Sequence, residues 1–268
     1  MTIFQDTSVE VARITHSARI REKIELAEQG LQTIVGSVVL KEFRNRVLKD
    51  ARYLLEQFHG GSSYSEVLHR VNRLPGQQRY KKNVCIGLLA TLFQHEDDDS
   101  VDDRCKSLLK TLIEHGMAQI EMRSLVIREA CAMHSIKIKK STNSKGKVKY
   151  DFGPNKCEKI TDCPIRSFLD SKREQLRLIH EELKSSEELT VELQHFKNFI
   201  ETNESFEGVE QSNPCSKLGD LLIALESSSV SKFMTLNIKE SRLLCKALGQ
   251  ELTWIKTNPE HSTEVINP

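Results

Sequence analysis

The feature that most constrains the fold of this chain is an apolar helical run near its C-terminal end. The run covers residues 217–226 (KLGDLLIALE), and Asp220 stands at its start. A short strand-like segment follows and ends in Thr235-x-Asn237. In an open α/β sheet, helix starts and the carboxyl ends of strands converge on one crevice, where such folds bind ligands. We therefore expect these polar residues to share a site.

The N-terminal residues repeat this pattern. Residues 2–5 (TIFQ) are typical of a β-strand, and residues 6–8 (DTS) end it. Acidic residues at strand ends, far apart in the sequence, are the usual components of a metal-dependent phosphodiesterase site. The two ends of the chain therefore predict one acidic site between them.

Strand and helix signals alternate at both ends of the chain, whereas the middle is predicted to be mostly helical. The elements expected at the ends are strands at 2–5, 31–35, 232–237 and 251–255, and helices at 9–26, 38–58, 218–227 and 238–249. The Lys-rich segment 136–154 predicts either a β-hairpin or a mobile basic loop. We expect an α/β core built from 1–58 plus 206–258, an inserted helical region at 59–205 and a tail at 259–268.

Composition excludes some classes of partner. The 268 residues carry a net charge of +1, so no overall field attracts a polyanion, and nucleic-acid contacts would need local basic patches. No apolar run approaches the ~18 residues that a membrane span needs, and no signal peptide is seen. Seven cysteines, an odd number, favour reduced thiols over a disulfide framework. The sequence thus predicts a cytoplasmic protein without a membrane partner.

Three short stretches carry a family resemblance. They are residues 4–9 (FQDTSV), 37–43 (SVVLKEF) and 219–225 (GDLLIAL), the last continuing through 233–237 (FMTLN). In this order they resemble the PIN-domain family of nucleases, over roughly residues 1–58 and 214–256. The resemblance implies a Rossmann-like parallel sheet flanked by helices, with acidic residues that bind Mg²⁺ or Mn²⁺ to hydrolyse RNA or, less often, DNA.

The resemblance also implies roles for individual residues. Asp6 matches the acid after the first strand, Glu42 the acid of the early helix, and Asp220 the acid that opens the later helix. These three are the expected catalytic and metal-binding residues. The hydroxyls of Ser8 and Thr235 match supporting positions.

Asn237 departs from the family pattern, because many members have a fourth Asp there. Asn keeps an oxygen ligand but loses a charge, so a second metal ion would bind more weakly. The departure favours a site with one ion, or with a second ion recruited by the substrate.

Each acid also has an ordinary explanation. Asp6 could simply close a strand, while Glu42 and Asp220 could be first-turn helix acids favoured by the helix dipole. Their joint order and setting favour the metal site over three unrelated roles.

Two basic clusters are candidates for binding a nucleic-acid backbone. One is the lysine cluster of 137–149, beside Tyr150 and Phe152, whose alternative is a solvated hairpin. The other lies on the helix that carries Glu42, where the cations fan around several faces. The residues selected from both clusters are Lys41, Arg44, Lys139, Lys140 and Lys147.

A possible zinc site and a possible role for Asp162 are two further hypotheses. A zinc set of Cys131, His134, Cys157 and Cys163 is conceivable, but the C-x₅-C spacing is wider than usual, which favours indifferent thiols. Asp162 lies in a predicted turn, residues 161–164 (TDCP), just before a predicted helix, and its carboxylate could reach the acidic site.

We therefore expect a cytoplasmic, metal-dependent ribonuclease whose insertion governs the choice of substrate or partner. The family resemblance suggests a bacterial toxin or defence effector, with an inhibitory protein partner or a homo-oligomer as further possibilities. The alternative is a catalytically reduced scaffold that binds nucleic acid or protein. Asn237 favours this alternative, and the presence of Asp6, Glu42 and Asp220 opposes it.

Overall fold

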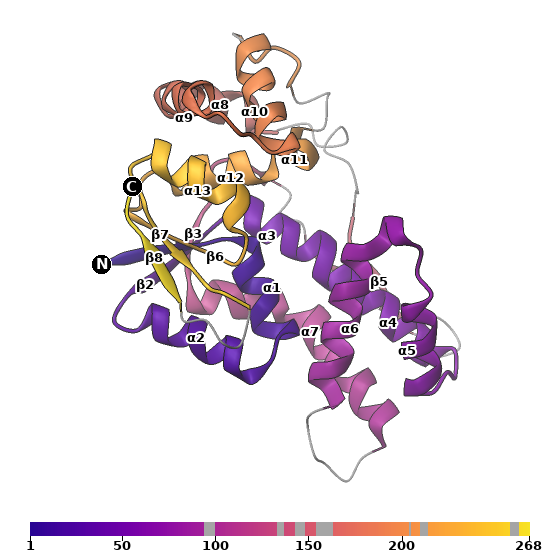
Figure 1. Ribbon diagram of the computed structural model, residues 1–268. Coiled ribbons are helices and arrows are strands. Elements are labelled where there is room, and N and C mark those ends of the chain that lie inside the picture. The colour runs from indigo at the N-terminus through magenta and orange to yellow at the C-terminus, as the bar shows by residue number, and fades with distance from the viewer. Residues whose placement is uncertain are drawn as a thin grey trace.

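A six-stranded sheet organises the chain (Figure 1). The computed structural model describes residues 1–93, 100–132, 137–142, 148–153, 163–203, 205–209, 214–257 and 263–268. Its strands are β1 (Thr2–Gln5), β2 (Gln32–Gly36), β3 (Leu125–Ile127), β6 (Lys232–Thr235), β7 (Glu251–Trp254) and β8 (Glu264–Ile266). Neighbouring strands are parallel except for β7 and β8. The predicted α/β class with a mostly parallel sheet is confirmed.

The strand order, β3-β2-β1-β6-β7-β8, places a topological switch at β1. From β1 the chain moves outward through β2 to β3, and later returns to pair β6 with the other edge of β1. Connections that leave in opposite directions put their helices on opposite faces, because such crossovers are right-handed. A crevice therefore opens at the carboxyl ends of β1 and β6.

Helices cover both faces of the sheet. Figure 1 shows α12 (Gly219–Ser227) and α13 (Ile238–Ala247) on one face, and α2 (Ala18–Glu28) on the other beside α1 (Thr7–Thr15). Successive residues of β1 serve opposite faces, since Ile3 belongs to the smaller apolar cluster while Phe4 stacks on Phe233 in the main core, with ring centroids 5.7 Å apart. Burial on both faces explains why β1, β2 and β6 each contain two consecutive buried apolar residues.

The helix predicted at 38–58 consists of three parts. These are α3 (Ser37–Phe43), the π-helical turn η1 (Arg44–Leu48) and α4 (Lys49–His59). Apolar periodicity does not reveal such a turn, because the hydrophobic face continues through it. π-helical turns are frequent at functional sites.

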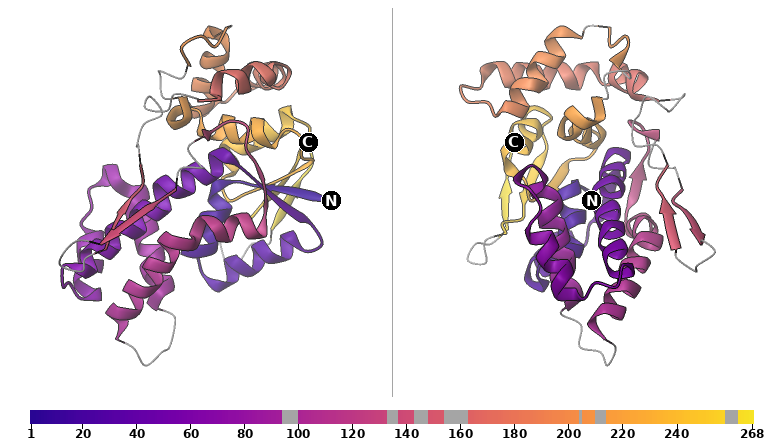
Figure 2. Two further views of the ribbon diagram at one scale, coloured as in Figure 1. Left: turned by 180° about the vertical axis from the view of Figure 1, so that it is seen from behind. Right: turned by 90° about the vertical axis from the view of Figure 1, so that its right-hand side faces the viewer.

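The middle of the chain forms two helical groups on opposite sides of the sheet domain (Figure 2). The first group, joined to α4, consists of α5 (Tyr64–Asn72), η2 (Gly76–Gln78), α6 (Arg79–Phe93) and α7 (Val101–Arg123). The second consists of α8 (Ile165–Ser171), α9 (Arg173–Ser185) and α10 (Val191–Thr202), with α9 against α13. The short α11 (Pro214–Lys217) leads into α12. Both groups share the main apolar core with the sheet.

The Lys-rich segment contains strands rather than an irregular loop. β4 (Lys139–Thr142) pairs antiparallel with β5 (Val148–Asp151), while residues 143–147 lie outside the described residues. Among the helices that the structure describes, none is long and apolar enough to cross a membrane.

Two strands of the main sheet lie outside the ranges predicted for the core. β3 falls within 59–205, and β8 falls within the predicted tail. Each has three residues. In so short a segment, the alternation of apolar and polar residues cannot distinguish a strand from a loop. β3 completes one edge of the sheet by pairing with β2.

The buried carboxylate of Glu226 fixes α12 against the start of α3. It is fully buried and accepts hydrogen bonds from the backbone N–H groups of Ser37 (3.0 Å), Val38 (3.0 Å) and Ala130 (3.2 Å), and from the Ser37 hydroxyl. The first N–H groups of a helix lack intrahelical acceptors and favour a negative charge. One side chain thus joins α12, α3 and the segment after β3.

We expect Glu226→Gln to lower the melting temperature by roughly 5–15 °C, because an amide cannot accept hydrogen bonds on both of its end atoms and leaves buried N–H groups unpaired. Thermal unfolding measured by circular dichroism tests this. The exposed Glu22→Gln, on α2, is the matched control and should leave the melting temperature unchanged. Equal melting temperatures for the two variants would contradict the role assigned to Glu226.

Candidate functional site

A pocket of about 510 Å³ opens at the carboxyl ends of β1 and β6. It contains all four residues predicted as metal ligands: Asp6, Glu42, Asp220 and Asn237. They come from the end of β1, from α3, from the start of α12 and from the residue before α13. The fold therefore brings together residues more than two hundred positions apart, at the switch point of the sheet.

Asp6 is held by two hydroxyl groups. Its Oδ2 accepts hydrogen bonds from Ser8 Oγ at 2.7 Å and from Thr235 Oγ1 at 2.8 Å, and its backbone N–H donates to Met234 O at 3.0 Å. Ser8 Oγ in turn accepts the N–H of Leu236 at 2.9 Å. The carboxylate is thus oriented from both α1 and β6, and its Oδ1 makes no hydrogen bond within the described part of the chain.

Glu42 and Asp220 meet through a close approach of their helices. A Cβ at position 219 would lie 2.6 Å from Glu42 Oε1, so the start of α12 lies directly beside this carboxylate. Glu42 is buried and lies 3.5 Å from Arg46 Nη2. Burial raises the pKa of Glu42 and Asp6 adds to the increase, while Arg46 opposes it.

Asp220 has a strongly perturbed carboxyl group. Burial, followed by the negative charges of Asp6, Glu42 and Glu240, raises the pKa of Asp220 to about 7, with Arg46 opposing. Like charges gathered in a partly buried pocket are a recurring sign of a functional site. A cation among these oxygens would relieve their repulsion.

Glu240 is an acid that the sequence analysis did not select. It is buried in the first turn of α13, and its Oε2 accepts a hydrogen bond from Asn237 Nδ2 at 2.7 Å. The negative charge missing at Asn237 is therefore present three residues later. The available signal was spacing, because residues at i and i+3 of a helix start share a face.

Several other residues that line the pocket were not selected from the sequence, and this part of the lining comes largely from helices outside the acidic motifs. It includes Arg46 from η1, Tyr80 and Asn83 from α6, and His16 at the end of α1. Arg46 was one of several cations along its helix, and its i+4 spacing from Glu42 was the signal that could have singled it out. No local pattern marked Tyr80 or Asn83, since their place depends on how α6 docks.

The donor chemistry of the acids fits a hard divalent cation, although the described residues form no preformed cage. Within the described residues, no group of three or more His, Cys, Asp and Glu side chains is arranged so that it could hold a metal ion. Mg²⁺ usually takes one or two carboxylates, keeps several waters and is completed by substrate phosphate oxygens. The Oδ1 of Asp6 and the carboxylate of Asp220 could supply the one or two carboxylate ligands that Mg²⁺ takes from a protein.

Two of the cations selected for nucleic-acid binding are buried. Lys41 Nζ donates to the carbonyl oxygen of Cys215 at 3.2 Å, and Arg44, only 1% exposed, donates to the carbonyl oxygen of Phe152. Their charges stabilise backbone carbonyls of neighbouring segments. Lys41 and Arg44 therefore contribute little exposed surface to this helix, because a helix that is covered on several sides cannot present every cation to solvent. Their predicted contact with phosphate stays a prediction.

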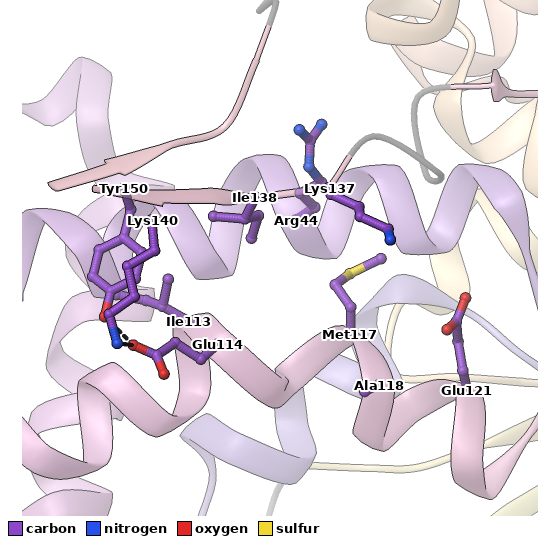
Figure 3. Close-up of a pocket in the computed structure, with 10 residues that line it drawn as sticks. All are labelled: Arg44, Ile113, Glu114, Met117, Ala118, Glu121, Lys137, Ile138, Lys140 and Tyr150. Carbon is purple, nitrogen blue, oxygen red and sulfur yellow. Dashed lines mark hydrogen bonds and ion pairs between the residues drawn. The ribbon is translucent and has the colours of Figure 1, made fainter. Parts of the chain in front are cut away.

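The lysines of the hairpin lie beside a different pocket. This pocket, of about 530 Å³, separates β4 and β5 from α7 (Figure 3). Lys140 lies 2.8 Å from Glu114, which also accepts the hydroxyl of Tyr150. Lys139 is exposed on β4, while Lys147 lies outside the described residues. Lys139 and Lys140, which the structure describes, do not line the acidic pocket.

Asp162 and two of the four residues of the suggested zinc set lie outside the described part of the chain. His134, Cys157 and Asp162 are all outside the described ranges. Cys131 is buried and Cys163 is partly buried.

We expect Asp220→Asn to stabilise the protein in EDTA, and to do so more at pH 8 than at pH 5. Because the pKa of Asp220 is raised by folding, the protonated carboxyl contributes stability that is complete below about pH 4 and is lost as the pH rises through about 7. The asparagine removes that loss. Melting temperatures at both pH values test this, with ~1 kcal/mol corresponding to about 2–4 °C. A shift independent of pH would contradict the electrostatic origin.

Comparison with known proteins adds no assignment to this geometry. No family model, no curated protein and no solved structure matches the chain. Its function is therefore argued from the residues and contacts described above.

Proposed function

We propose that the chain is a PIN-like, metal-dependent ribonuclease that hydrolyses phosphodiester bonds with Mg²⁺ or Mn²⁺. The observation that carries this proposal is the meeting of Asp6, Glu42 and Asp220 at the switch point of a parallel sheet, with the pKa of Asp220 raised to about 7. Hard carboxylate oxygens suit these two ions.

In this proposal Asp6 and Asp220 hold the ion, and Glu42 orients the attacking water. The bound ion supplies activation of that water and stabilisation of the leaving oxygen. Ser8 and Thr235 keep one oxygen of Asp6 occupied, so that its other oxygen faces the pocket. Arg46 balances part of the negative charge beside Glu42.

The substrate is assigned as RNA, with DNA as the alternative, and this choice follows from the resemblance to PIN domains. A bacterial toxin or defence effector in the cytoplasm is the setting that the same resemblance favours. An inhibitory protein or a second copy of the chain would be the corresponding partner.

We expect Asp220→Asn to reduce metal-dependent cleavage of labelled single-stranded RNA by about 10²–10³-fold, because Lewis-acid stabilisation is worth several kcal/mol. Cleavage is measured with Mn²⁺, Mg²⁺ or EDTA, and in parallel on single-stranded DNA. Asp170→Asn, which alters a carboxylate paired with Arg173 outside the pocket, is the matched control and should retain activity. Cleavage that persists in EDTA, or in Asp220→Asn, would refute the proposed mechanism.

A second candidate function is a scaffold that binds nucleic acid or protein without hydrolysis. Two observations favour it: no ready three-ligand group exists among the described side chains, and Glu42 is already paired with Arg46. Such a scaffold would have little affinity for divalent ions.

Thermal stabilisation by Mn²⁺ separates the two candidates. For a nuclease site we expect Mn²⁺ at one hundred times its dissociation constant to add about 2.7 kcal/mol, which raises the melting temperature by roughly 5–11 °C. Asp6→Asn should abolish the gain while keeping its two hydroxyl contacts. A wild-type protein that binds RNA but shows no shift with Mn²⁺ would support the scaffold.

A further inference from the structure

Helix α6 forms a wall of the acidic pocket although it belongs to the middle of the chain. Tyr80, Asn83 and Val84 line the pocket, and Gly87 follows one turn later on the same face. A Cβ at position 87 would lie 2.6 Å from the carbonyl oxygen of Thr15. Glycine therefore allows α6 to dock against the end of α1, beside which it lies in Figure 1, and this fixes the wall.

Tyr80 is a large aromatic side chain held at the rim of this pocket. Its side chain is 43% exposed, and the guanidinium carbon of Arg46 lies 4.9 Å from its ring centroid. Tyr80 therefore contacts this cation and still keeps part of its surface exposed to solvent. An exposed aromatic in this setting offers a stacking surface, which every nucleobase can use.

Arg46 is the counter-charge that an anionic substrate requires here. Among the described residues that line the pocket, it is the one with a permanent positive charge. Burial lowers the pKa of His16, so its imidazole is neutral near pH 7. The Arg46 guanidinium lies 3.5 Å from Glu42, and an arginine side chain remains charged in proteins. A guanidinium can bind phosphate oxygens and also stack on a base.

Asn83 completes the wall with a group that can read a base. Its exposed amide lies three residues beyond Tyr80 and therefore on the same side of α6. An amide carries both donors and an acceptor, which match the Watson–Crick edge of a nucleobase. That edge is accessible only when the base is unpaired.

We propose that Arg46, Tyr80 and Asn83 form a subsite for one unpaired nucleotide, with its phosphate on Arg46 and its base stacked on Tyr80. The inference rests on the proposed nuclease function and narrows its substrate to single-stranded nucleic acid. The pocket has the volume of sites that take one small ligand, about 300–1,000 Å³, and so admits a single splayed nucleotide.

Binding of a labelled oligouridine by fluorescence anisotropy tests the subsite separately from cleavage. The measurement uses Asp220→Asn in Mg²⁺, in which hydrolysis is suppressed. Adding Tyr80→Ala should weaken binding about 5- to 150-fold, whereas Tyr80→Phe should bind nearly as the parent. Phe93→Ala, which removes another exposed aromatic from α6, is the matched control and should have no effect.

Salt dependence identifies the phosphate contact. Adding Arg46→Gln should reduce the slope of log K against log salt by about 0.7, the contribution of one phosphate on a single strand. Tyr80→Ala should leave that slope unchanged, and so should the exposed Arg70→Gln, the charge-matched control.

An abasic oligonucleotide tests the stacking contact. It should bind the Tyr80→Ala protein and its parent equally.

The outcomes separate the subsite from the nuclease. Binding that depends on Tyr80 in a protein whose wild type never cleaves would keep the subsite and reject hydrolysis. Metal-dependent cleavage with Tyr80→Ala binding like Phe93→Ala would keep the nuclease and overturn the subsite. Absence of oligouridine binding, or equal affinity for a blunt RNA duplex, would also overturn the subsite.

Discussion

The hydrogen bonds between the carboxylate of Glu226 and the start of α3 are the contact on which the rest of the site depends. They fix α12 against α3, and the two helices carry Asp220 and Glu42. Gly219, next to Asp220, lies directly beside the Glu42 carboxylate. A buried carboxylate with four donors is favourable only when every contact is made, so the helices have one stable register. The meeting of the acids follows from that register.

The same packing makes the pocket electrostatically unfavourable in the absence of a cation. Burial raises the pKa of Asp220, the negative charges of Asp6, Glu42 and Glu240 raise it further, and Arg46 offsets only part of the increase. Buried like charges cost stability, and folded proteins retain them where a ligand or a reaction uses them. The contacts that stabilise this arrangement are the hydrogen bonds from the Ser8 and Thr235 hydroxyls to Asp6, and those that Glu226 accepts.

The middle of the chain belongs to the site as much as the two ends do. Its helices share the main apolar core with the sheet, β3 completes one edge of that sheet, and α6 supplies the wall that faces the acids. In our proposals the ends provide the reaction and the middle provides the choice of nucleotide. This division explains why the motifs of the ends alone do not describe the pocket.

Local sequence was enough to predict the alternating strands and helices at both ends, and the positions of Asp6, Glu42, Asp220 and Asn237 within them. Those features depend on periodicity, on turn residues and on helix starts, which are properties of neighbouring residues. Only the tertiary structure decided that Glu240 joins the acids, that Tyr80 and Arg46 face them, and that Lys41 and Arg44 are buried. It also decided that β3 and β8 extend the sheet. Each of these outcomes depends on contacts between distant segments, because packing rather than local pattern determines which face of a helix is covered and which short segment finds a strand to pair with.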